Sequence, residues 1–436
     1  MANSRLPSER FVVGGHATCP LAAAMMGAQA WDGSSSKQQH ADAVVFIGTA
    51  LLAVTLLLLG HNVKWPLDDF VEYWAAGSLA LAGGNPYDPA AMLVEQRSIG
   101  WTAPSAVMMY NPPWTLPLAS LFSLMPFPVA RSVWLPLQLL IVLWCAIRLW
   151  IMYGGEHRLA LRAAGVALLW MPTIVALRMG QVSPLILLGL VGFLWSVSEK
   201  RDFAAGAFLT LTVVKPQLVA LVWVAVMLAV IGERRWRMLA GMVVAFGGIS
   251  IATWLLHPDA FAQYAHLMTS ARPTYAFESP NVATVLRLAA GGSSDWPQYL
   301  PTALGAVFVA LVWWKRRENW NWTQEFRWLV LLSCLATSYG GWPFDLLVLV
   351  IPIVAEAARL SRVGSTWALT AGTAAFASIT AGALALHAAH VPQALFIWMA
   401  PSVAIALLAL GRARQCAWAM SIPPGSVAPA GANQRF

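Results

Sequence analysis

The stretch "VARSVWLPLQLLIVLWCAIRLWIM", residues 129–152, decides the class of fold. Its only charged side chains are Arg131 and Arg148, and nearly all the others are apolar. A helix needs about 20 apolar residues to cross the hydrocarbon core of a bilayer, and this stretch is long enough. It therefore predicts a membrane-spanning helix.

Similar apolar runs recur along the whole chain of 436 residues, of which 59% are hydrophobic and 11% are charged. This composition indicates an all-α polytopic membrane protein rather than a soluble domain. The net charge of +8 does not indicate nucleic-acid binding, because the basic residues lie in short clusters between apolar runs, such as "ERRWR" (233–237) and "KRRENWNWTQEFR" (315–327). The four cysteines have no spacing that is typical of a metal site or a disulfide framework.

Basic loops mark the cytoplasmic side of a membrane protein, so we place every basic cluster on that side. We then expect about twelve transmembrane helices within residues 43–411, with both chain termini in the cytoplasm. Residues 1–42 and 412–436 become cytoplasmic tails, the first of them disordered, and residues 61–128 and 257–298 become outer loops. The predicted spans are 43–60, 129–152, 163–178, 182–198, 203–215, 217–232, 238–256, 299–314, 327–339, 343–358, 365–386 and 393–411.

Two segments, 203–232 and 327–358, are short for the two crossings that this topology requires of each. Each arm would be about 20–24 Å long, which is less than a core of about 30 Å. A single tilted span for each segment is the alternative, but it would move the basic clusters that follow to the outer side. We expect short hairpins whose turns stop below the outer surface, which are tolerated where they line a wet cavity and which point to a binding site.

With this topology, the polar residues that interrupt the apolar pattern gather on the outer side of the membrane. No comparable set falls on the cytoplasmic side. A functional site on the outer face is therefore expected. The segments are "LDDFVEYW" (67–74), "GGNPYDP" (83–89), "YNPPW" (110–114), "RMGQVSP" (178–184), "VKPQ" (214–217), "FESPN" (277–281) and "YGGWPFD" (339–345).

Asp68 and Asp69 of the first outer segment are the candidates for chemistry. In a helix over residues 68–82, Asp69 and Tyr73 share one face, and Asp68 and Glu72 share an adjacent one. Acids also favour the positive end of a helix dipole, and a helix start alone explains Asp68 well. A helix start explains the presence of one acid more readily than the presence of three.

Three cations on the outer side are candidates for binding a phosphate group: Lys215, Arg178 and Arg272. A lysine at a hairpin tip near the membrane boundary is costly unless it is paired or hydrated. Lys215 either snorkels to the headgroups or recognises phosphate as a point charge, and both alternatives hold for the two arginines.

The remaining candidates are polar or aromatic residues of the outer turns. Asp345 needs a partner, which a helix N-terminus could supply. Asn111, Gln181 and Asn281 have amides that can bond sugar hydroxyls, and Trp342 could stack on a sugar ring, although most tryptophans of such a chain belong to the interfacial belts.

Four of these motifs occur in an order and spacing that resembles glycosyltransferase family 87. These are membrane glycosyltransferases of the C-type fold, and their characterised members are mannosyl- and arabinosyltransferases. The resemblance runs from about residue 44 to residue 410. The motifs are "DDFVEYWAAGSLALAGGNPYDP" (68–89), "YNPPWTLPLASLFSLMP" (110–126), "GQVSPLILLGL" (180–190) and "AGAFLTLTVVKPQLVAL" (205–221).

The resemblance implies inverting transfer of a hexose or pentose, mannose first, from a polyprenyl-phosphate donor to a lipid or glycan acceptor on the outer face of the plasma membrane. Family members carry an aspartate before an aromatic residue in the first outer loop, a position that falls here on Asp69, with Asp68 as the close rival. Many relatives carry a histidine in the late outer turn. This chain reads "GGWPFD" there, so Asp345 or Trp342 would serve instead, or the role is absent.

The chemistry suits these residues. A carboxylate can act as general base on an acceptor hydroxyl, and a phosphate leaving group needs nearby positive charge rather than a second acid. We expect no metal and no cofactor. The alternative function is a multi-span transporter or a lipid-linked sugar flippase, but alternating access should place polar groups along a path that reaches both faces.

Overall fold

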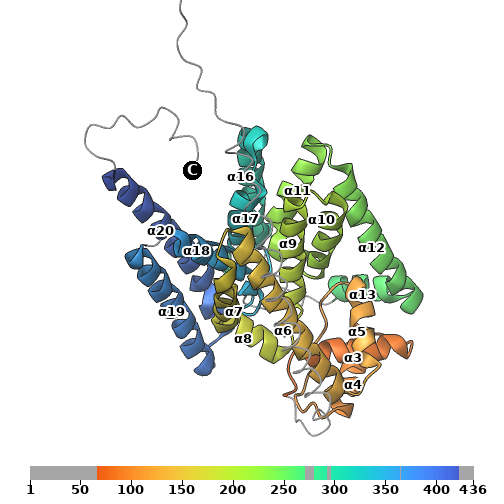
Figure 1. Ribbon diagram of the computed structural model, residues 1–436. Coiled ribbons are helices and arrows are strands. Elements are labelled where there is room, and N and C mark those ends of the chain that lie inside the picture. The colour runs from red at the N-terminus through yellow and green to blue at the C-terminus, as the bar shows by residue number, and fades with distance from the viewer. Residues whose placement is uncertain (1–65, 271–278, 292–295, 364, 422–436) are drawn as a thin grey trace, which may run out of the picture.

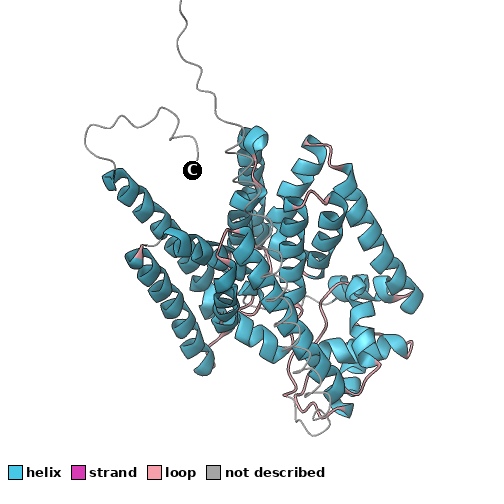
Figure 2. Ribbon diagram, viewed as in Figure 1, coloured by secondary structure: helices cyan, strands magenta, loops and turns pink. Residues whose placement is uncertain are grey.

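The computed structural model describes residues 66–270, 279–291, 296–363 and 365–421. These residues contain helices and connecting loops but no strand (Figure 2), which confirms the expectation of an all-α fold. Several features expected from the sequence lie outside the described residues: the tail over 1–42, the span over 43–60, Arg272, and residues 422–436 of the second tail.

The helices follow one another along the chain as labelled in Figure 1. The α-helices are α3 (Phe70–Leu81), α4 (Pro89–Ser98), α5 (Leu116–Ser123), α6 (Phe127–Met152), α7 (Ala160–Leu169), α8 (Met171–Met179), α9 (Ser183–Ser198), α10 (Asp202–Leu209), α11 (Ala220–Gly232), α12 (Trp236–Leu256), α13 (Ala260–Ser270), α15 (Val282–Ala289), α16 (Leu300–Arg316), α17 (Trp322–Ala336), α18 (Val350–Val363), α19 (Thr366–Ala388) and α20 (Met399–Ser421). The 3₁₀ helices are η2 (Pro113–Thr115), η3 (His157–Leu159), η4 (Thr210–Val214), η5 (Pro216–Val219), η6 (Trp296–Tyr299), η7 (Arg317–Asn319), η8 (Asp345–Leu349) and η9 (Gln393–Trp398).

Four helices in the described part of the chain are long and apolar enough to cross a membrane by themselves. They are Phe127–Met152, Trp236–Leu256, Thr366–Ala388 and Gln393–Gly411, and a bent pair, α7 with α8, could make a fifth. Several such helices are expected of a multi-pass membrane protein. Every interval predicted to span after residue 61 coincides with a helix or a pair of helices, but the count of twelve crossings stays a prediction.

Within the described residues, eleven spans were expected and up to five helices or bent pairs qualify, because many of the apolar helices are short or broken. Ser183–Ser198, Asp202–Val214 and Pro216–Gly232 are apolar but too short to cross unaided. The pair α7 and α8 bends by 68° at Trp170, and Pro172 in the first turn of α8 suits a new helix start there.

The two turns expected in the short hairpin segments are present. Lys215 separates η4 from η5 with φ −146° and ψ 68°, because the following Pro216 disfavours helical geometry in the residue before it. Gly340 and Gly341 have φ values of 75° and 72°, a conformation that glycine adopts without steric cost. Both breaks therefore come from local turn chemistry.

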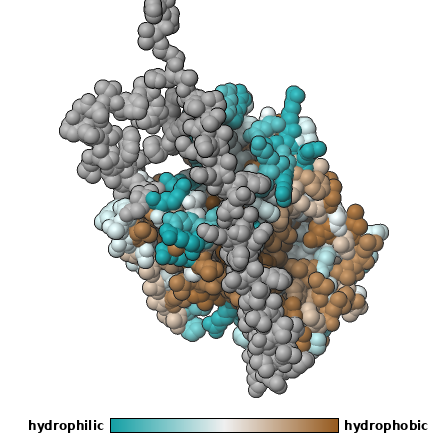
Figure 3. Space-filling view, in the orientation of Figure 1, coloured by the Kyte–Doolittle hydropathy of each residue, from teal (hydrophilic) through white to brown (hydrophobic). Residues whose placement is uncertain are grey.

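The polar and apolar parts of the molecule separate along its length. Figure 1 shows α3, α4, α5 and α13 at the lower end of the view, whereas the α9–α10, α11–α12 and α16–α17 connections lie toward the upper end. Those upper connections contain the basic clusters at 199–201, 233–237 and 315–317. Figure 3 shows hydrophilic side chains at this upper end and a broad hydrophobic surface below them.

Helices α10 and α12 approach each other closely through glycines, as small residues allow between membrane helices. A Cβ atom on Gly206 would come within 2.0 Å of the carbonyl oxygen of Met238, and one on Gly241 within 2.0 Å of the carbonyl oxygen of Phe203. The backbones therefore leave no room for even a methyl group at these two positions.

We expect Gly206→Ala to destabilise the folded protein by about 1–3 kcal/mol, because the added methyl group must push the backbones of α10 and α12 apart. The measurement is the thermal unfolding midpoint of the purified protein in detergent. Gly247→Ala in α12 is the matched control, since a Cβ atom there meets nothing within 4 Å and alanine favours the helix. Equal midpoints for the two variants would contradict the close approach.

Candidate active site

The site begins at Asp69, which precedes the first residue of α3. It is the N-cap residue, but its side chain makes no capping hydrogen bond to its own helix. Instead, its Oδ2 accepts a hydrogen bond from Nε2 of Gln181, a residue far along the chain. The carboxylate of Asp69 is thereby directed away from α3 and towards the turn between α8 and α9.

That turn is held in place by α6. Trp134 donates from its indole nitrogen to the carbonyl oxygen of Gly180 at 2.8 Å, and Gln138 donates to the carbonyl oxygen of Gln181 at 2.6 Å. Gly180 has φ 70°, and a Cβ atom there would come within 2.7 Å of the Phe70 side chain. Glycine is therefore required for α3 to lie against the turn, which brings Asp69 within reach of Gln181.

Gln181 joins two halves of the site and is 3% exposed. Its Oε1 accepts hydrogen bonds from the Tyr73 hydroxyl at 3.0 Å and from Nζ of Lys215 at 3.2 Å, while its Nε2 donates to Asp69. Since both donors face one end of the amide and an acceptor faces the other, the orientation of the amide is determined by its partners. One side chain therefore links the carboxylate of Asp69 to the ammonium group of Lys215.

Lys215 forms an ion pair with Asp345, with Nζ and Oδ1 2.8 Å apart. Asp345 is 1% exposed and also accepts from the Ser183 hydroxyl at 2.9 Å and from the backbone N–H of Trp342 at 3.3 Å. The Lys215 ammonium group lies 4.8 Å from the centre of the Phe344 ring. The charge of Lys215 is thus paired with a carboxylate inside the protein.

The electrostatic setting differs among the three acids of the first outer segment. Burial raises the pKa of Asp69, while the hydrogen bond from Gln181 and the charge of Lys215 act in the opposite direction. Burial raises the pKa of Asp68 to about 6, against the attraction of the Arg131 and Arg178 charges. Asp69 therefore has the contacts that favour a charged carboxylate inside the site.

Glu72 is a residue of the site that the sequence reasoning missed. It is 8% exposed, and its burial raises the pKa of its carboxyl group well above the ordinary value. The hydroxyl group of the adjacent Tyr73 donates to Gln181. Glu72 is therefore a buried acid next to the chain of hydrogen bonds that runs from Tyr73 through Gln181 to Asp69. Three acids in five positions were the only sequence signal for it.

Two of the amides that we expected to bind sugar make backbone contacts instead. Asn111 donates to the carbonyl oxygen of Val214 at 3.1 Å, directly before Lys215, and Trp114 donates to that of Val213 at 3.0 Å. Asn281 caps α15 by accepting from the backbone N–H of Thr284 at 2.8 Å and donates to the carbonyl oxygen of Gly340 at 2.9 Å. These contacts position the two turns that carry Lys215 and Asp345.

The other candidates lie around the site rather than in its network of hydrogen bonds. Arg178 is exposed at the end of α8, and its carbonyl oxygen accepts from the guanidinium group of Arg131 at 2.6 Å. The half-buried indole ring of Trp342 packs against the hydrophobic core. Of the eleven residues predicted from the sequence, the structure thus joins five: Asp69, Tyr73, Gln181, Lys215 and Asp345.

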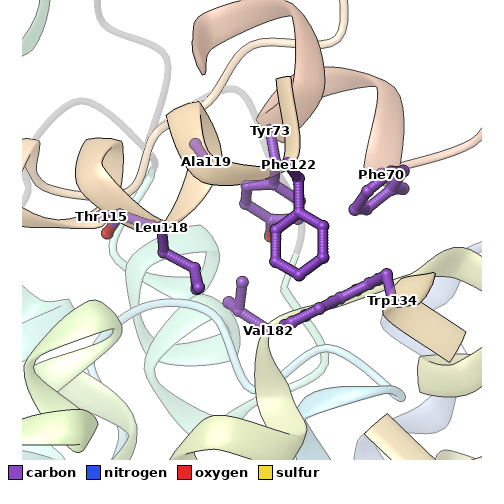
Figure 4. A pocket seen from close by; sticks show the side chains of 8 residues that line it. All are labelled: Phe70, Tyr73, Thr115, Leu118, Ala119, Phe122, Trp134 and Val182. Carbon is purple, nitrogen blue, oxygen red and sulfur yellow. The ribbon is translucent and has the colours of Figure 1, made fainter. Parts of the chain in front are cut away.

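Aromatic packing supports the side of the site that carries Asp69 and Tyr73. Figure 4 shows a small apolar pocket, with the ring of Tyr73 on one side and Val182, next to Gln181, on another. The rings of Phe70 and Trp134 stack with centroids 6.2 Å apart, and Phe122 meets Trp134 edge-on at 5.0 Å. Packing of this kind restricts the rotamers of α3 residues and holds Asp69 in position.

The described residues contain no group of three or more His, Cys, Asp or Glu side chains that could hold a metal ion.

Two levels of identity follow from these observations. The fold is that of a multi-helix membrane protein with a partly buried carboxylate–amide–lysine site. The family model for glycosyltransferase family 87 matches residues 109–338, which is more than half of the chain. The protein belongs to glycosyltransferase family 87 and is therefore a membrane glycosyltransferase. No curated protein and no solved structure gives a match.

The matched range contains part of the site and is completed by residues on either side. Asn111, Gln181 and Lys215 lie inside it, whereas Asp69 precedes it and Asp345 follows it. The hydrogen bonds of Gln181 and Lys215 join these outlying acids to the family region.

Proposed function

We propose that this protein transfers a sugar, mannose in the first instance, from a polyprenyl-phosphate donor to a hydroxyl group of a lipid or glycan acceptor, with Asp69 as general base. One observation carries the proposal. The amide of Gln181 bonds the carboxylate of Asp69 at one end and the ammonium group of Lys215 at the other. A base and a phosphate-binding cation therefore lie on the two sides of one side chain.

The reaction is a single displacement. The acceptor oxygen attacks the anomeric carbon, its proton passes to Asp69, and the bond from the anomeric carbon to the phosphate oxygen breaks, so the anomeric configuration is inverted. The transition state has oxocarbenium character, and the departing phosphate carries the electron pair. The ammonium group of Lys215 stabilises that negative charge, because a fixed charge in a site without bulk water costs no reorganisation during the reaction.

Asp345 and Arg178 have supporting roles in this scheme. Asp345 holds Lys215 in the turn before donor binds, and the phosphate then becomes a second anionic partner of the same ammonium group. Arg178 is exposed and contributes positive potential at the entrance. Trp342 belongs to the turn that precedes Asp345, and Asn281 contacts that turn at Gly340. Both residues shape the sugar subsite by positioning this turn.

We place this reaction on the outer face of the plasma membrane, with about twelve spans and both termini in the cytoplasm. The basic connections lie at the upper end of Figure 1 and α3, which Asp69 directly precedes, lies at the lower end, and this separation supports the orientation. Single cysteines introduced at Arg234 and at Tyr339 test it in whole cells. An impermeant maleimide should label the second position and leave the first unlabelled. Labelling of position 234 would overturn the topology.

The decisive assay supplies the full-length protein in lipid nanodiscs with polyprenyl-phosphate mannose or polyprenyl-phosphate arabinose and a lipid extract as acceptor. We expect one donor to yield a glycosylated product of inverted anomeric configuration, together with free polyprenyl phosphate. In sealed vesicles, movement of the intact donor between leaflets without cleavage of the sugar–phosphate bond would support the flippase alternative instead.

We expect Glu72→Gln to retain most of the transfer activity and Glu72→Ala to lose about tenfold in kcat/KM. Glutamine keeps the size and polarity of the buried Glu72 side chain, whereas alanine leaves a cavity next to Tyr73. Steady-state kinetics of the two variants give the comparison. Equal loss in both would show that a charged Glu72 takes part in the reaction.

A further inference from the structure

A second set of buried polar groups lies on α17 and α18, apart from the candidate active site. Helix α18 packs against α6, α7 and α17. Arg327 of α17 and Arg359 of α18 both pair with Glu356, with nitrogen–oxygen distances of 3.2 Å and 3.3 Å. The Glu356 side chain is 5% exposed. Two guanidinium groups therefore share one buried carboxylate, which leaves the cluster with a net positive charge.

Two donor groups of this cluster have no hydrogen-bond partner in the part of the chain that the structure describes. They are the hydroxyl of Tyr153, a residue that is 7% exposed, and Nε of Arg327. Tyr153 follows the last residue of α6 and lies within electrostatic range of both Arg327 and Arg359. Buried donors are nearly always satisfied in native proteins, so a pair of them beside a positive cluster points to an acceptor that comes from outside the chain.

A third cation and an aromatic ring border the same place. The exposed Arg362 lies against Gly154, where an added Cβ atom would come within 2.8 Å of its Nη1. The guanidinium carbon of Arg327 lies 5.2 Å from the centre of the Trp328 ring. Tryptophan and arginine together are typical of the headgroup level of a membrane.

We propose that Tyr153, Arg327, Arg359 and Arg362 form a binding site for a phosphate-bearing anion at the membrane surface. Guanidinium groups bind phosphate oxygens through paired N–H donors, and a tyrosine hydroxyl adds a further donor. An anionic phospholipid headgroup and free inorganic phosphate present the same chemistry to these side chains. The site is separate from Asp69 and does not depend on the sugar transfer reaction.

The simpler explanation is that these arginines only follow the preference for basic residues on the cytoplasmic side. That preference accounts for exposed cations such as Arg237, which lies near the start of α12. It does not account for a buried tyrosine hydroxyl and a buried guanidinium N–H that both face the cluster without a partner.

Native mass spectrometry of the full-length protein in detergent tests the proposal. The protein is titrated with phosphatidylglycerol or, separately, with phosphatidylcholine, and a thermal-shift arm uses inorganic phosphate alone. We expect a preference for phosphatidylglycerol that falls about tenfold in the double variant Arg359→Gln/Arg362→Gln, in which Arg327 still pairs with Glu356. Stabilisation by inorganic phosphate without any lipid preference would support the site with the free ion as its ligand.

Two single variants separate binding from a structural role. Tyr153→Phe should weaken phosphatidylglycerol binding about threefold while the thermal midpoint stays constant or rises, because the variant removes a buried hydroxyl without a partner. Arg237→Gln makes the same charge change as the other arginine variants at an exposed position and should bind as the wild type does. Two results with the variants would overturn the proposal: equally weakened phosphatidylglycerol binding in Arg237→Gln, or wild-type binding in Tyr153→Phe. An absence of response to both phosphatidylglycerol and phosphate would also overturn it, because bound water would then be the partner of the buried donors.

Discussion

Asp69→Asn is expected to lower kcat for sugar transfer by about 10²–10⁴, because the acceptor hydroxyl then has no general base. The amide is nearly isosteric with the carboxylate, so the packing of α3 against the turn at Gly180 should persist. Kinetics with saturating donor in nanodiscs measure the loss, and the thermal midpoint reports the fold. A variant with full activity would remove Asp69 from the mechanism.

Asp68→Asn is the matched control, since it makes the same chemical change one residue away. Gln181 is hydrogen bonded to Asp69 and not to Asp68, and the Oδ1 atom of Asp68 has no hydrogen-bond partner among the described residues. We expect its kcat to stay within about threefold of the wild type, as for a residue that tunes potential without touching the reacting atoms.

The dependence of kcat/KM on pH separates the two acids further. A general base acts in its deprotonated form, so activity should rise with pH through the pKa of the base and be lost below it. Because burial raises the pKa of Asp69, this acidic limb should lie above the ordinary aspartate value of 3.8. If Asp68 were the base, the limb would lie near its pKa of about 6 and would disappear in Asp68→Asn.

Lys215→Gln is expected to lower kcat/KM by about 10²–10³, because the charge that stabilises the departing phosphate is lost. The same variant leaves Asp345 buried without its cation, which by itself destabilises a protein by about 3–5 kcal/mol. Transfer kinetics must therefore be read beside a measurement of folding.

The double variant Lys215→Gln/Asp345→Asn resolves this ambiguity. An amide pair replaces the buried ion pair, so the thermal midpoint should recover towards that of the wild type, while activity stays low. Arg178→Gln is the matched loss of charge at an exposed position and should cost less than tenfold. Recovery of activity together with stability in the double variant would show that Lys215 is structural.

The apolar pattern predicted the positions of the helices better than it predicted the number of crossings. All spans expected after residue 61 coincide with helical segments, since a run of apolar residues in a bilayer has to satisfy its backbone hydrogen bonds internally. Counting crossings needs helix length as well, and α9, α10 and α11 are short. These helices are short because turns at residues such as Lys215 end them. Whether a short helix contributes to a crossing depends on how neighbouring helices cover it.

Amide side chains show where inference from residue type fails. Asn111, Gln181 and Asn281 were equivalent in the sequence, as polar residues of outer turns. The structure separates them: Asn111 and Asn281 bond backbone groups of neighbouring turns, and only Gln181 contacts charged side chains. Glu72 shows the converse, because its burial by other elements could not be read from its place in an acidic cluster.

By itself, the sequence determined the membrane class, the helical intervals, the turns at Lys215 and at Gly340–Gly341, and the set of polar residues from which the site is drawn. These depend on hydropathy and on proline and glycine geometry, which act over a few residues. Only the tertiary structure decided that Asp69, Gln181, Lys215 and Asp345 form one network. Gln181 lies 112 positions from Asp69, and Lys215 lies 130 from Asp345, so their contacts exist only once the helices have packed.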